Sequence, residues 1–509
     1  MEATNVKRTT RGTVYVSIET ALNFLAGLIF YVIAARILPT ADIGGLTALT
    51  FIFTIVPVTA ELALPTAAAK YMSEFIGRGE TDKAAAVSAA VKKIVLITSL
   101  VSLFLVAILS TWFSHLVWGD ASHAQIFLIL SVALFLTTIR ATYLGFLQGL
   151  QSYGKYSLVG FFAYALARVA AVILVVMGYG LTGVMVGWLI GEVVGLPLTI
   201  ALFYGFLPKP TTTFDMKTLF SFSLPLFALL FVTTASDWTD RMLFFSISRN
   251  LSNLGVYDLA VRGATTLSIF YIAFSTIVLP TFSEIHGRSG RKPITRTLKT
   301  SLRYLTYLIL PAGFGLAAIS KTAMALMFGP SYVAIGRLPL AILALATFFI
   351  AIGTVFSSTL QAIGETRVFI MISLAAIVAD ILVIIIAVPF FGVVGASFGR
   401  ITLWAVLFAL TYIALNKRVR VEFDKESLWK GMVSSVIMAA ILLGFEFTYA
   451  TSFSPGFDAV IEIISGAIIY GICLFALNGL HKRDFEILMH TAPTFSHKIL
   501  KRFERFFTR

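Results

Sequence analysis

Residues 381–391 read ILVIIIAVPFF, an apolar run without any alternation of polar and apolar side chains. It belongs to one of many apolar stretches of roughly 20 residues, a length that matches a hydrocarbon core of about 30 Å at about 1.5 Å rise per helical residue. The strands of a membrane barrel would instead show about ten alternating residues. Inside lipid every backbone N–H and C=O must be paired within the segment, so these stretches predict transmembrane helices.

The composition excludes a soluble protein. Of the 509 residues, 58% are hydrophobic and only 13% are charged, so apolar residues far exceed what one aqueous core can hold. The single cysteine, Cys473, lies inside a predicted span, which excludes an intrachain disulfide. The first apolar stretch follows Lys7, Arg8 and Arg11 and lacks a small-residue cleavage site, so we expect it to be retained as a span.

The apolar stretches predict an all-α polytopic membrane protein with about fourteen transmembrane helices. They lie near residues 12–35, 42–65, 92–114, 124–147, 157–178, 181–205, 218–247, 254–282, 303–327, 338–363, 368–390, 393–415, 432–450 and 458–478. Lysine and arginine gather in alternate loops, as expected for short loops on the cytoplasmic side. We therefore expect both termini in the cytoplasm and interpret the net charge of +14 mostly as topology, not as nucleic-acid binding.

The two halves of the chain share a pattern. LPT at 64–66 recurs at 279–281, and GLTGVMVG at 180–187 is echoed by GVVGASFG at 392–399. Such matches, in the same order at a nearly constant offset, predict a duplicated six-span unit, and two six-helix lobes form a transporter architecture. We expect a first lobe over residues 1–210, a second lobe over 211–420, two further helices over 421–480 and a basic amphipathic tail over 481–509 that lies on anionic headgroups.

Two glycine motifs match nucleotide-binding patterns only in form. The segment 149–155 lacks the hydroxyl residue of a phosphate loop because Tyr156 stands in its place, and the motif at 178–183 follows no strand. Gly183 and Gly187 form a small-xxx-small pair, which favours close helix packing. The histidines fall in loops or in the tail, and no zinc-protease motif occurs, so we expect neither an enzyme nor a metal site.

Ionisable side chains inside spans are the best candidates for function. Each costs about 2.5 to 3.5 kcal/mol on insertion scales, and such groups usually face a bundle interior or a water-filled cavity. Buried ion pairing is the alternative, because Asp258 and Arg262, like Asp237 and Arg241, are one helical turn apart. The candidates are Glu19, Glu61, Arg140, Arg168, Glu192, Asp237, Asp240, Arg241, Asp258, Arg262, Lys321, Asp380 and Arg400.

Arg168 and Asp380 are separated by nearly the same offset as the glycine motifs beside them. Opposite charges therefore occupy equivalent positions in the two predicted lobes. We expect them to flank a cavity between the lobes or to pair across it.

Short motifs suggest a family. AARILPTADIG at 34–44, LQG at 147–149 and YGK at 153–155, set in spans arranged as six, six and two, resemble the polysaccharide and oligosaccharidyl-lipid flippases of the multidrug/oligosaccharidyl-lipid/polysaccharide exporter superfamily. The resemblance covers nearly the whole chain. It implies a V-shaped cavity, lined largely by the first two helices of each repeat, that moves a glycan on a polyprenyl phosphate or diphosphate to the outer face by alternating access.

The resemblance also implies which residues meet the substrate. The preferred contacts to a phosphate or a sugar acid are Arg262, Arg168 and Arg140, in a cavity of mixed sign that differs from the peptidoglycan-precursor flippases. The expected partners are a polyprenyl-linked glycan and membrane lipids, the expected state is a monomer, and no cofactor is expected apart from a coupling ion, H⁺ or Na⁺. The cavity residues expected on this basis are Glu19, Glu61, Arg140, Arg168, Asp237, Asp240, Arg241, Asp258, Arg262 and Asp380.

Two other functions stay open at the sequence level. A cation-coupled multidrug antiporter of the same superfamily would use Glu19, Glu61, Asp237 and Asp240 as coupling carboxylates, although those exporters usually have twelve spans. A membrane glycosyltransferase or ligase would act on the same lipid carrier. It would normally need a large outer loop or a divalent-metal carboxylate pair, and the sequence offers neither.

Overall fold

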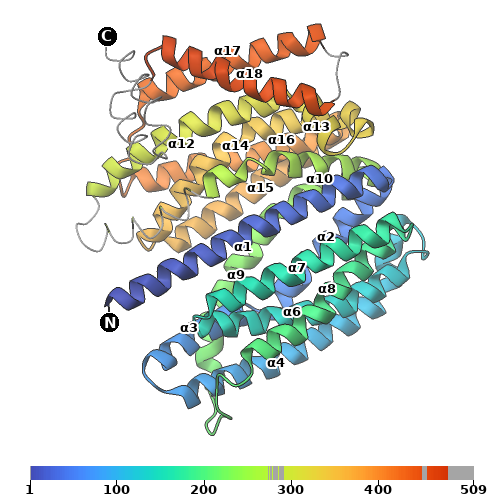
Figure 1. Ribbon diagram of the computed structural model, residues 1–509, viewed down its shortest axis with the longest axis vertical. Coiled ribbons are helices and arrows are strands. Elements are labelled where there is room, and N and C mark those ends of the chain that lie inside the picture. Colours follow the sequence, from blue (N-terminus) through green and yellow to red (C-terminus); the bar gives the residue numbers. More distant parts are fainter. Residues whose placement is uncertain are drawn as a thin grey trace. The chain divides into compact units, whose positions relative to one another are not determined.

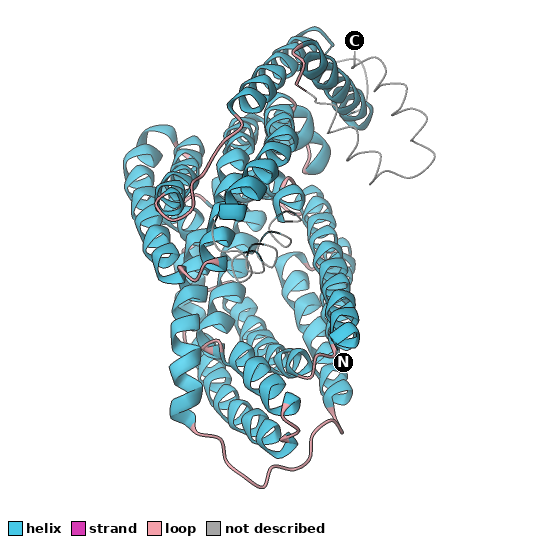
Figure 2. Ribbon diagram, turned by 90° about the vertical axis from the view of Figure 1, so that its left-hand side faces the viewer, coloured by secondary structure: helices cyan, strands magenta, loops and turns pink. Residues whose placement is uncertain are grey.

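The computed structural model describes residues 2–272, 274, 278, 282, 285, 292–449 and 455–479. Throughout this part of the chain the regular elements are helices, and Figure 2 shows helices joined by loops without a strand. Most of them are labelled in Figure 1. The α-helices are α1 (Glu2–Ile37), α2 (Thr40–Glu61), α3 (Leu64–Gly77), α4 (Thr81–Ile108), α5 (Ser110–Trp118), α6 (Ala124–Gly149), α7 (Tyr153–Val176), α8 (Gly180–Phe203), α9 (Met216–Ser248), α10 (Leu251–Thr265), α12 (Lys292–Ala318), α13 (Ser320–Met327), α14 (Val333–Ala362), α15 (Thr366–Phe391), α16 (Val393–Asn416), α17 (Lys425–Tyr449) and α18 (Pro455–Ala476), with a short 3₁₀ helix at Pro330–Tyr332.

Twelve of the described helices are long and apolar enough to cross a membrane, or thirteen if the bent pair α12 and α13 forms one span. The span predicted at 254–282 begins in α10, but most of residues 273–291 lie outside the described part of the chain. The amphipathic tail predicted over 481–509 lies wholly outside it.

Three predicted spans differ from the helices in the structure. The helix expected to begin at 92 already begins at Thr81, because the first turns of α4 bury alanines and Val87. The span expected at 303–327 is bent by 77° between α12 and α13. The span expected at 42–65 ends at Glu61, and a separate helix, α3, follows it with a buried apolar face.

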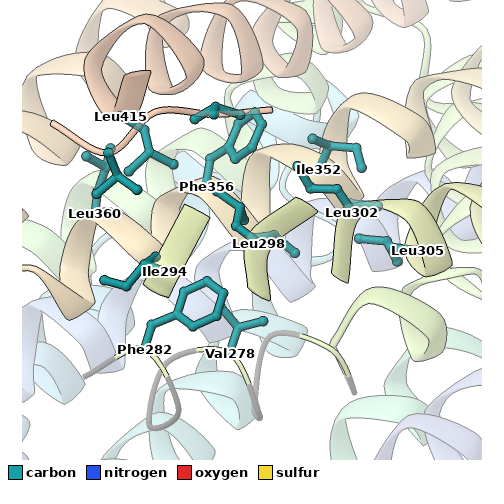
Figure 3. Close-up of a cluster of buried hydrophobic side chains, with 14 of the residues drawn as sticks. Val278, Phe282, Ile294, Leu298, Leu302, Leu305, Ile352, Phe356, Leu360 and Leu415 are labelled. Atoms are coloured by element: carbon teal, nitrogen blue, oxygen red, sulfur yellow. The ribbon is translucent and has the colours of Figure 1, made fainter. Parts of the chain in front are cut away.

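The chain divides into two compact units. Unit 1 comprises residues 1–262, 327–336 and 377–399, and unit 2 comprises the remainder. The core of unit 1 that lies under α3 is made of fully buried side chains from α3, α4 and α6, joined by Leu219 of α9. The core of unit 2 packs α12 against α14 and α16, with Phe356 and Leu298 at its centre (Figure 3).

A ridge of small residues joins α7 to α8 within unit 1, and the two helices lie side by side in Figure 1. A Cβ atom at Gly191 would lie 2.5 Å from the Cβ of Ala167, and one at Gly195 would lie 2.5 Å from the Cβ of Ala163. Gly187 meets the main chain of Ala171 in the same way. Glycine at four-residue spacing therefore lets the backbones of the two helices approach closely, as small-xxx-small patterns do in membranes.

Candidate functional site: buried charges of unit 1

Asp258 is the centre of a buried ion network. Its carboxylate is fully buried on α10 and lies between two arginines. Oδ2 is 2.6 Å from Nε of Arg262, one helical turn along α10, and Oδ1 is 2.6 Å from Nε of Arg241 on α9. The pairing of Asp258 with Arg262 is therefore the one that their sequence spacing indicates.

The closest ion-pair partner of Arg241 is Asp258 and not Asp237, which its helical spacing had suggested. Its Nη1 donates to the main-chain carbonyl of Asp237, while its Nε reaches Asp258. Asp240, which is 1% exposed, lies 3.8 Å from Arg241 Nη1 and accepts a 2.6 Å hydrogen bond from the hydroxyl of Tyr257. The helical spacing of Arg241 and Asp237 was a poor guide because the stronger partner lies on another helix.

An aromatic ring completes this network. The guanidinium of Arg262 lies over the ring of Tyr31 on α1, 3.5 Å from the ring centroid, and Tyr31 Oη is 3.0 Å from Thr50 Oγ1 on α2. Such cation–π contacts partly compensate a cation for lost water. The network thus links α1, α2, α9 and α10, the helices that the family resemblance assigns to the cavity.

Arg140 on α6 forms a second, separate pair. Its Nε and Nη2 donate to the two carboxylate oxygens of Glu192 on α8, at 2.6 and 2.8 Å. Both side chains are nearly buried, and the fork geometry is the strong bidentate form of this interaction. Glu19 and Glu61 also interact electrostatically with Arg140, so three carboxyl groups surround this one arginine.

Glu61 stands at a strained corner. It is the last residue of α2, and Leu62 and Ala63 after it both adopt positive φ angles, 50° and 57°. For residues other than glycine this left-handed conformation costs about 1–2 kcal/mol each. Leu64 then begins α3, with Pro65 in its first turn. Surrounding packing must hold this corner in place, since the local sequence does not favour it.

Arg168 on α7 has a different environment. Its Cζ lies 5.0 Å from the ring centroid of Phe30, 4.6 Å from that of Tyr164 and 4.5 Å from that of Trp188. Its Nε and Nη1 are buried and have no hydrogen-bond partner among the described residues. That Arg168 and Asp380 flank a cavity or pair across it stays a prediction.

The remaining candidates lie elsewhere. Asp380 on α15 is fully buried, and a Cβ at Gly399 of α16 would lie 2.7 Å from its Oδ1, so Gly399 serves close packing against this carboxylate. Arg400 is 8% exposed, and Lys321 lies on α13 in unit 2. Among the described side chains, no group of three His, Cys, Asp or Glu residues is placed to hold a metal ion.

Sequence reasoning missed the aromatic side chains. Tyr31, Tyr164, Trp188 and Tyr257 each contact a charged member of the site. One signal was present, since Tyr164 precedes Arg168 by one helical turn and Trp188 precedes Glu192 by the same spacing. Aromatic residues at helical spacing from an intramembrane charge therefore belong among the candidates.

Comparison with known proteins concerns the family and the fold of the chain. A family model described as polysaccharide biosynthesis protein matches residues 9–286. The chain is 23% identical to a probable low-salt glycan biosynthesis flippase of Haloferax volcanii over 50% of this chain and 54% of that protein. It is 23% identical to a succinoglycan biosynthesis transport protein of Rhizobium meliloti over 63% of this chain and 64% of that protein. The chain spans about half the length of the Haloferax relative.

Solved structures have the same fold. A lipid II flippase in an inward closed conformation superposes with a TM-score of 0.72 at 18% identity, covering 91% of this chain and 98% of that one. An inward-facing multidrug resistance transporter of the MATE family, of the MOP superfamily, gives a TM-score of 0.68 at 13% identity, covering 85% of this chain and 98% of that one. The predicted all-helical polytopic fold is thereby confirmed, and the protein is a multi-pass membrane protein.

Proposed function

Since this chain belongs to the family of polysaccharide biosynthesis proteins, we propose that it moves a lipid-linked oligosaccharide or polysaccharide precursor across the cytoplasmic membrane. The observation that carries the proposal is the buried network of Asp258, Arg241, Arg262 and Tyr31. It joins charged and aromatic groups of α1 and α9, two candidate membrane spans, to α10, where a further span is predicted to begin. Intramembrane charges of this kind are expensive, and they usually mark a substrate or ion pathway.

The chemistry of the proposed cargo fits such a pathway. A phosphate headgroup and sugar hydroxyls need polar partners when they leave water, whereas the polyprenyl tail can remain in the bilayer. Charged side chains supply these partners, and aromatic faces such as Tyr31 and Trp188 suit the apolar faces of sugar rings. Of the three arginines expected from the sequence to contact the acidic groups, Arg140 and Arg262 already bind Glu192 and Asp258, so Arg168 is the proposed contact.

Close packing near the start of α2 and α10 supports movement by alternating access. A Cβ at Gly255 would lie 2.7 Å from the backbone nitrogen of Gly44, and a Cβ at Gly44 would overlap the carbonyl of Leu251. These ends adjoin the loops at Arg36 and Arg249, which we propose lie on the extracytoplasmic side. In this proposal the glycine contact closes the outer end of the pathway and opens when cargo leaves.

The proposed function is tested by reconstitution. Vesicles would carry the full chain and a polyprenyl-phosphate-linked disaccharide with a fluorescent label, and a membrane-impermeant quencher would report label that has crossed. We expect protein-containing vesicles to lose nearly all fluorescence and protein-free vesicles about half. Equal quenching in both would refute the proposed function.

The proposed closure is tested by preventing it. Gly44→Val and Gly255→Val each add a side chain where even a Cβ would overlap the facing main chain. Both variants should slow flipping in the vesicle assay, because the pathway can no longer close at this end. Unchanged flipping by both folded variants would show that the contact between α2 and α10 is not a gate.

A cation-coupled mode, or multidrug antiport, is the second candidate, favoured by the surplus of carboxylates around Arg140. Glu19 and Glu61 share the electrostatic field of an arginine whose donors already bind Glu192. In this mode H⁺ or Na⁺ would neutralise one of the two carboxylates during the cycle. Ethidium efflux that depends on an imposed ion gradient, with no movement of the labelled glycolipid, would establish antiport and refute the flippase.

A further inference from the structure

Three buried N–H donors lie together without an acceptor at the junction of α7 and α8. They are Nε and Nη1 of Arg168 and Nε1 of Trp188, and no described residue accepts a hydrogen bond from any of them. Trp188 is only 2% exposed, and its ring lies 4.5 Å from the guanidinium carbon of Arg168. Buried donors are paired in the great majority of proteins, so three unpaired donors in one place require an explanation.

The neighbouring rings do not supply the missing acceptors. Phe30, Tyr164 and Trp188 present ring faces that attract the positive charge of Arg168, which favours its burial. A ring face is at most a weak hydrogen-bond acceptor, in contrast to a carbonyl or carboxylate oxygen. The surroundings therefore stabilise the charge but leave its hydrogen-bonding capacity available.

Charge balance separates Arg168 from the other arginines of the site. Arg140 is bound by both oxygens of Glu192, and Arg241 and Arg262 share Asp258. Arg168 forms no ion pair with a described carboxylate. One uncompensated positive charge, next to three free donors, matches a ligand group with one negative charge and several acceptor oxygens.

We propose that Arg168 and Trp188 form a binding site for a singly charged oxyanion of the transported glycolipid, with Trp188 as a specificity-determining residue; this proposal rests on the proposed flippase function. Two parts of such a molecule share this chemistry, a phosphodiester that joins the lipid to the first sugar and the carboxylate of an acidic sugar. In either case the oxygens accept from Arg168 and Trp188, while Tyr164 and Phe30 enclose the group and exclude water. Gly187 and Gly191 of α8 pack closely against α7, and this packing fixes the positions of Arg168 and Trp188 relative to each other.

The two sources are distinguished with three synthetic probes: polyprenyl phosphoryl-glucose, polyprenyl glucuronide without phosphate, and neutral polyprenyl glucoside. Binding to the full chain in lipid nanodiscs would be measured by native mass spectrometry. We expect the wild type to prefer at least one anionic probe over the neutral one. Preference for the phosphoryl probe assigns the site to the phosphodiester, and preference for the glucuronide assigns it to the sugar acid.

Substitutions then test the two donors. Arg168→Gln should weaken binding of the preferred anionic probe by about 10-fold to 100-fold, because a charge-assisted hydrogen bond is lost, and should leave the neutral probe unchanged. Trp188→Phe keeps the ring but removes the N–H, and it should weaken the same probe by about fivefold. Trp404→Phe is the matched control, because Trp404 lies in unit 2 and also has a buried, unpaired Nε1; it should change nothing.

Failure of the anion site and failure of the proposed flippase function would give different results. An anionic preference that persists unchanged in Trp188→Phe and in Arg168→Gln would overturn the site, and so would equal binding of all three probes by the wild type. Trp188→Phe is conservative, so it decides the question even where Arg168→Gln does not fold. If the glycolipid is not flipped in vesicles while the Arg168-dependent anionic preference is present, the flippase fails and the anion site stands.

Discussion

Arg140 and Arg168 lie on neighbouring helices of the same unit, yet their surroundings are opposite. Arg140 donates twice to Glu192, at 2.6 and 2.8 Å, and both side chains are nearly buried. Arg168 lies among three aromatic rings, and two of its buried nitrogens have no described acceptor. The first arginine is saturated by the protein, and the second is not.

This difference shows how intramembrane charges divide into roles. A buried ion pair contributes little net stability, but losing one partner leaves an uncompensated charge that is very unfavourable. Arg168 is only partly buried, and its buried Nε and Nη1 already lack an acceptor, so its removal should cost far less stability. The response of stability to substitution should therefore separate the paired network from the proposed binding site.

The largest loss of stability is expected when Asp258 is replaced. Asp258→Ala leaves Arg241 and Arg262 buried without their shared carboxylate, so the free energy of unfolding should fall by about 3–5 kcal/mol or more. Thermal unfolding of the purified protein in detergent measures the loss. The control, Asp120→Ala in an exposed loop, should shift stability by less than about 1 kcal/mol. Equal melting temperatures for the two variants would show that the network is not a closed structural unit.

A double-mutant cycle at Arg140 and Glu192 is expected to give the next largest effect. Each single change to Met strands a buried charge and should cost about 3–5 kcal/mol, whereas the double variant should be close to wild type, because hydrophobic replacement of a buried pair is often neutral. The coupling energy is obtained from the melting curves of all four proteins. Additive losses would show that Arg140 and Glu192 do not compensate each other's charge.

The sequence predicts most of the fold because a bilayer leaves few choices. Apolar stretches of membrane length must be helices, and the described helices follow them closely. The corner at Leu62 and Ala63 and the break at Leu109 escaped prediction, since the apolar run continues through both places. Those features are set by tertiary packing, which a pattern of hydrophobicity does not contain.

The candidate site was predictable only in part. Charged residues within apolar stretches identified every arginine and carboxylate of the two networks, because each is costly in lipid. The spacing of Asp258 and Arg262 indicated their pairing, but partners on other helices were not predictable, since Arg241 binds Asp258 on α10 and Arg168 contacts rings on α1 and α8. Helical spacing reports neighbours on one helix alone.

A smaller loss of stability is expected when the packing between α7 and α8, which positions Arg168 beside Trp188, is disturbed. Gly191→Val places a branched side chain against Ala167 and Ala163, where even a Cβ would lie 2.5 Å from the next one. Overpacking of this kind costs about 1–3 kcal/mol and should also reduce binding of the anionic probe. The control is Gly444→Val, where a Cβ meets no neighbouring atom. If the two variants melt alike, α7 and α8 are not packed as described.

The ion pair of Asp424 and Arg303, at the start of α17, should contribute less to stability. Asp424 precedes α17, and although its partial burial raises the pKa, hydrogen bonds from Ser427 and the charge of Arg303 bring the pKa below its ordinary 3.8. A depressed pKa contributes stability above the unfolded value, and this stability is lost as the pH falls through the folded value. Asp424→Ala should therefore cost about 1 kcal/mol at pH 7 and less as the pH falls below about 4. An unchanged difference across that range would exclude ionisation as the cause.

The smallest effect on stability is expected for replacement of Arg168, which is compared directly with replacement of Arg140. Arg168→Met removes a buried charge that no described carboxylate compensates and keeps an unbranched side chain among Phe30, Tyr164 and Trp188. Losing the cation–π attraction lowers stability and removing the unpaired donors raises it, so the free energy of unfolding should change by less than about 1 kcal/mol. Melting curves without glycolipid measure this change, and Arg140→Met is the matched comparison. A loss as large as that of Arg140→Met would mean that Arg168 is structural, because only a partner within the protein could make its removal so unfavourable.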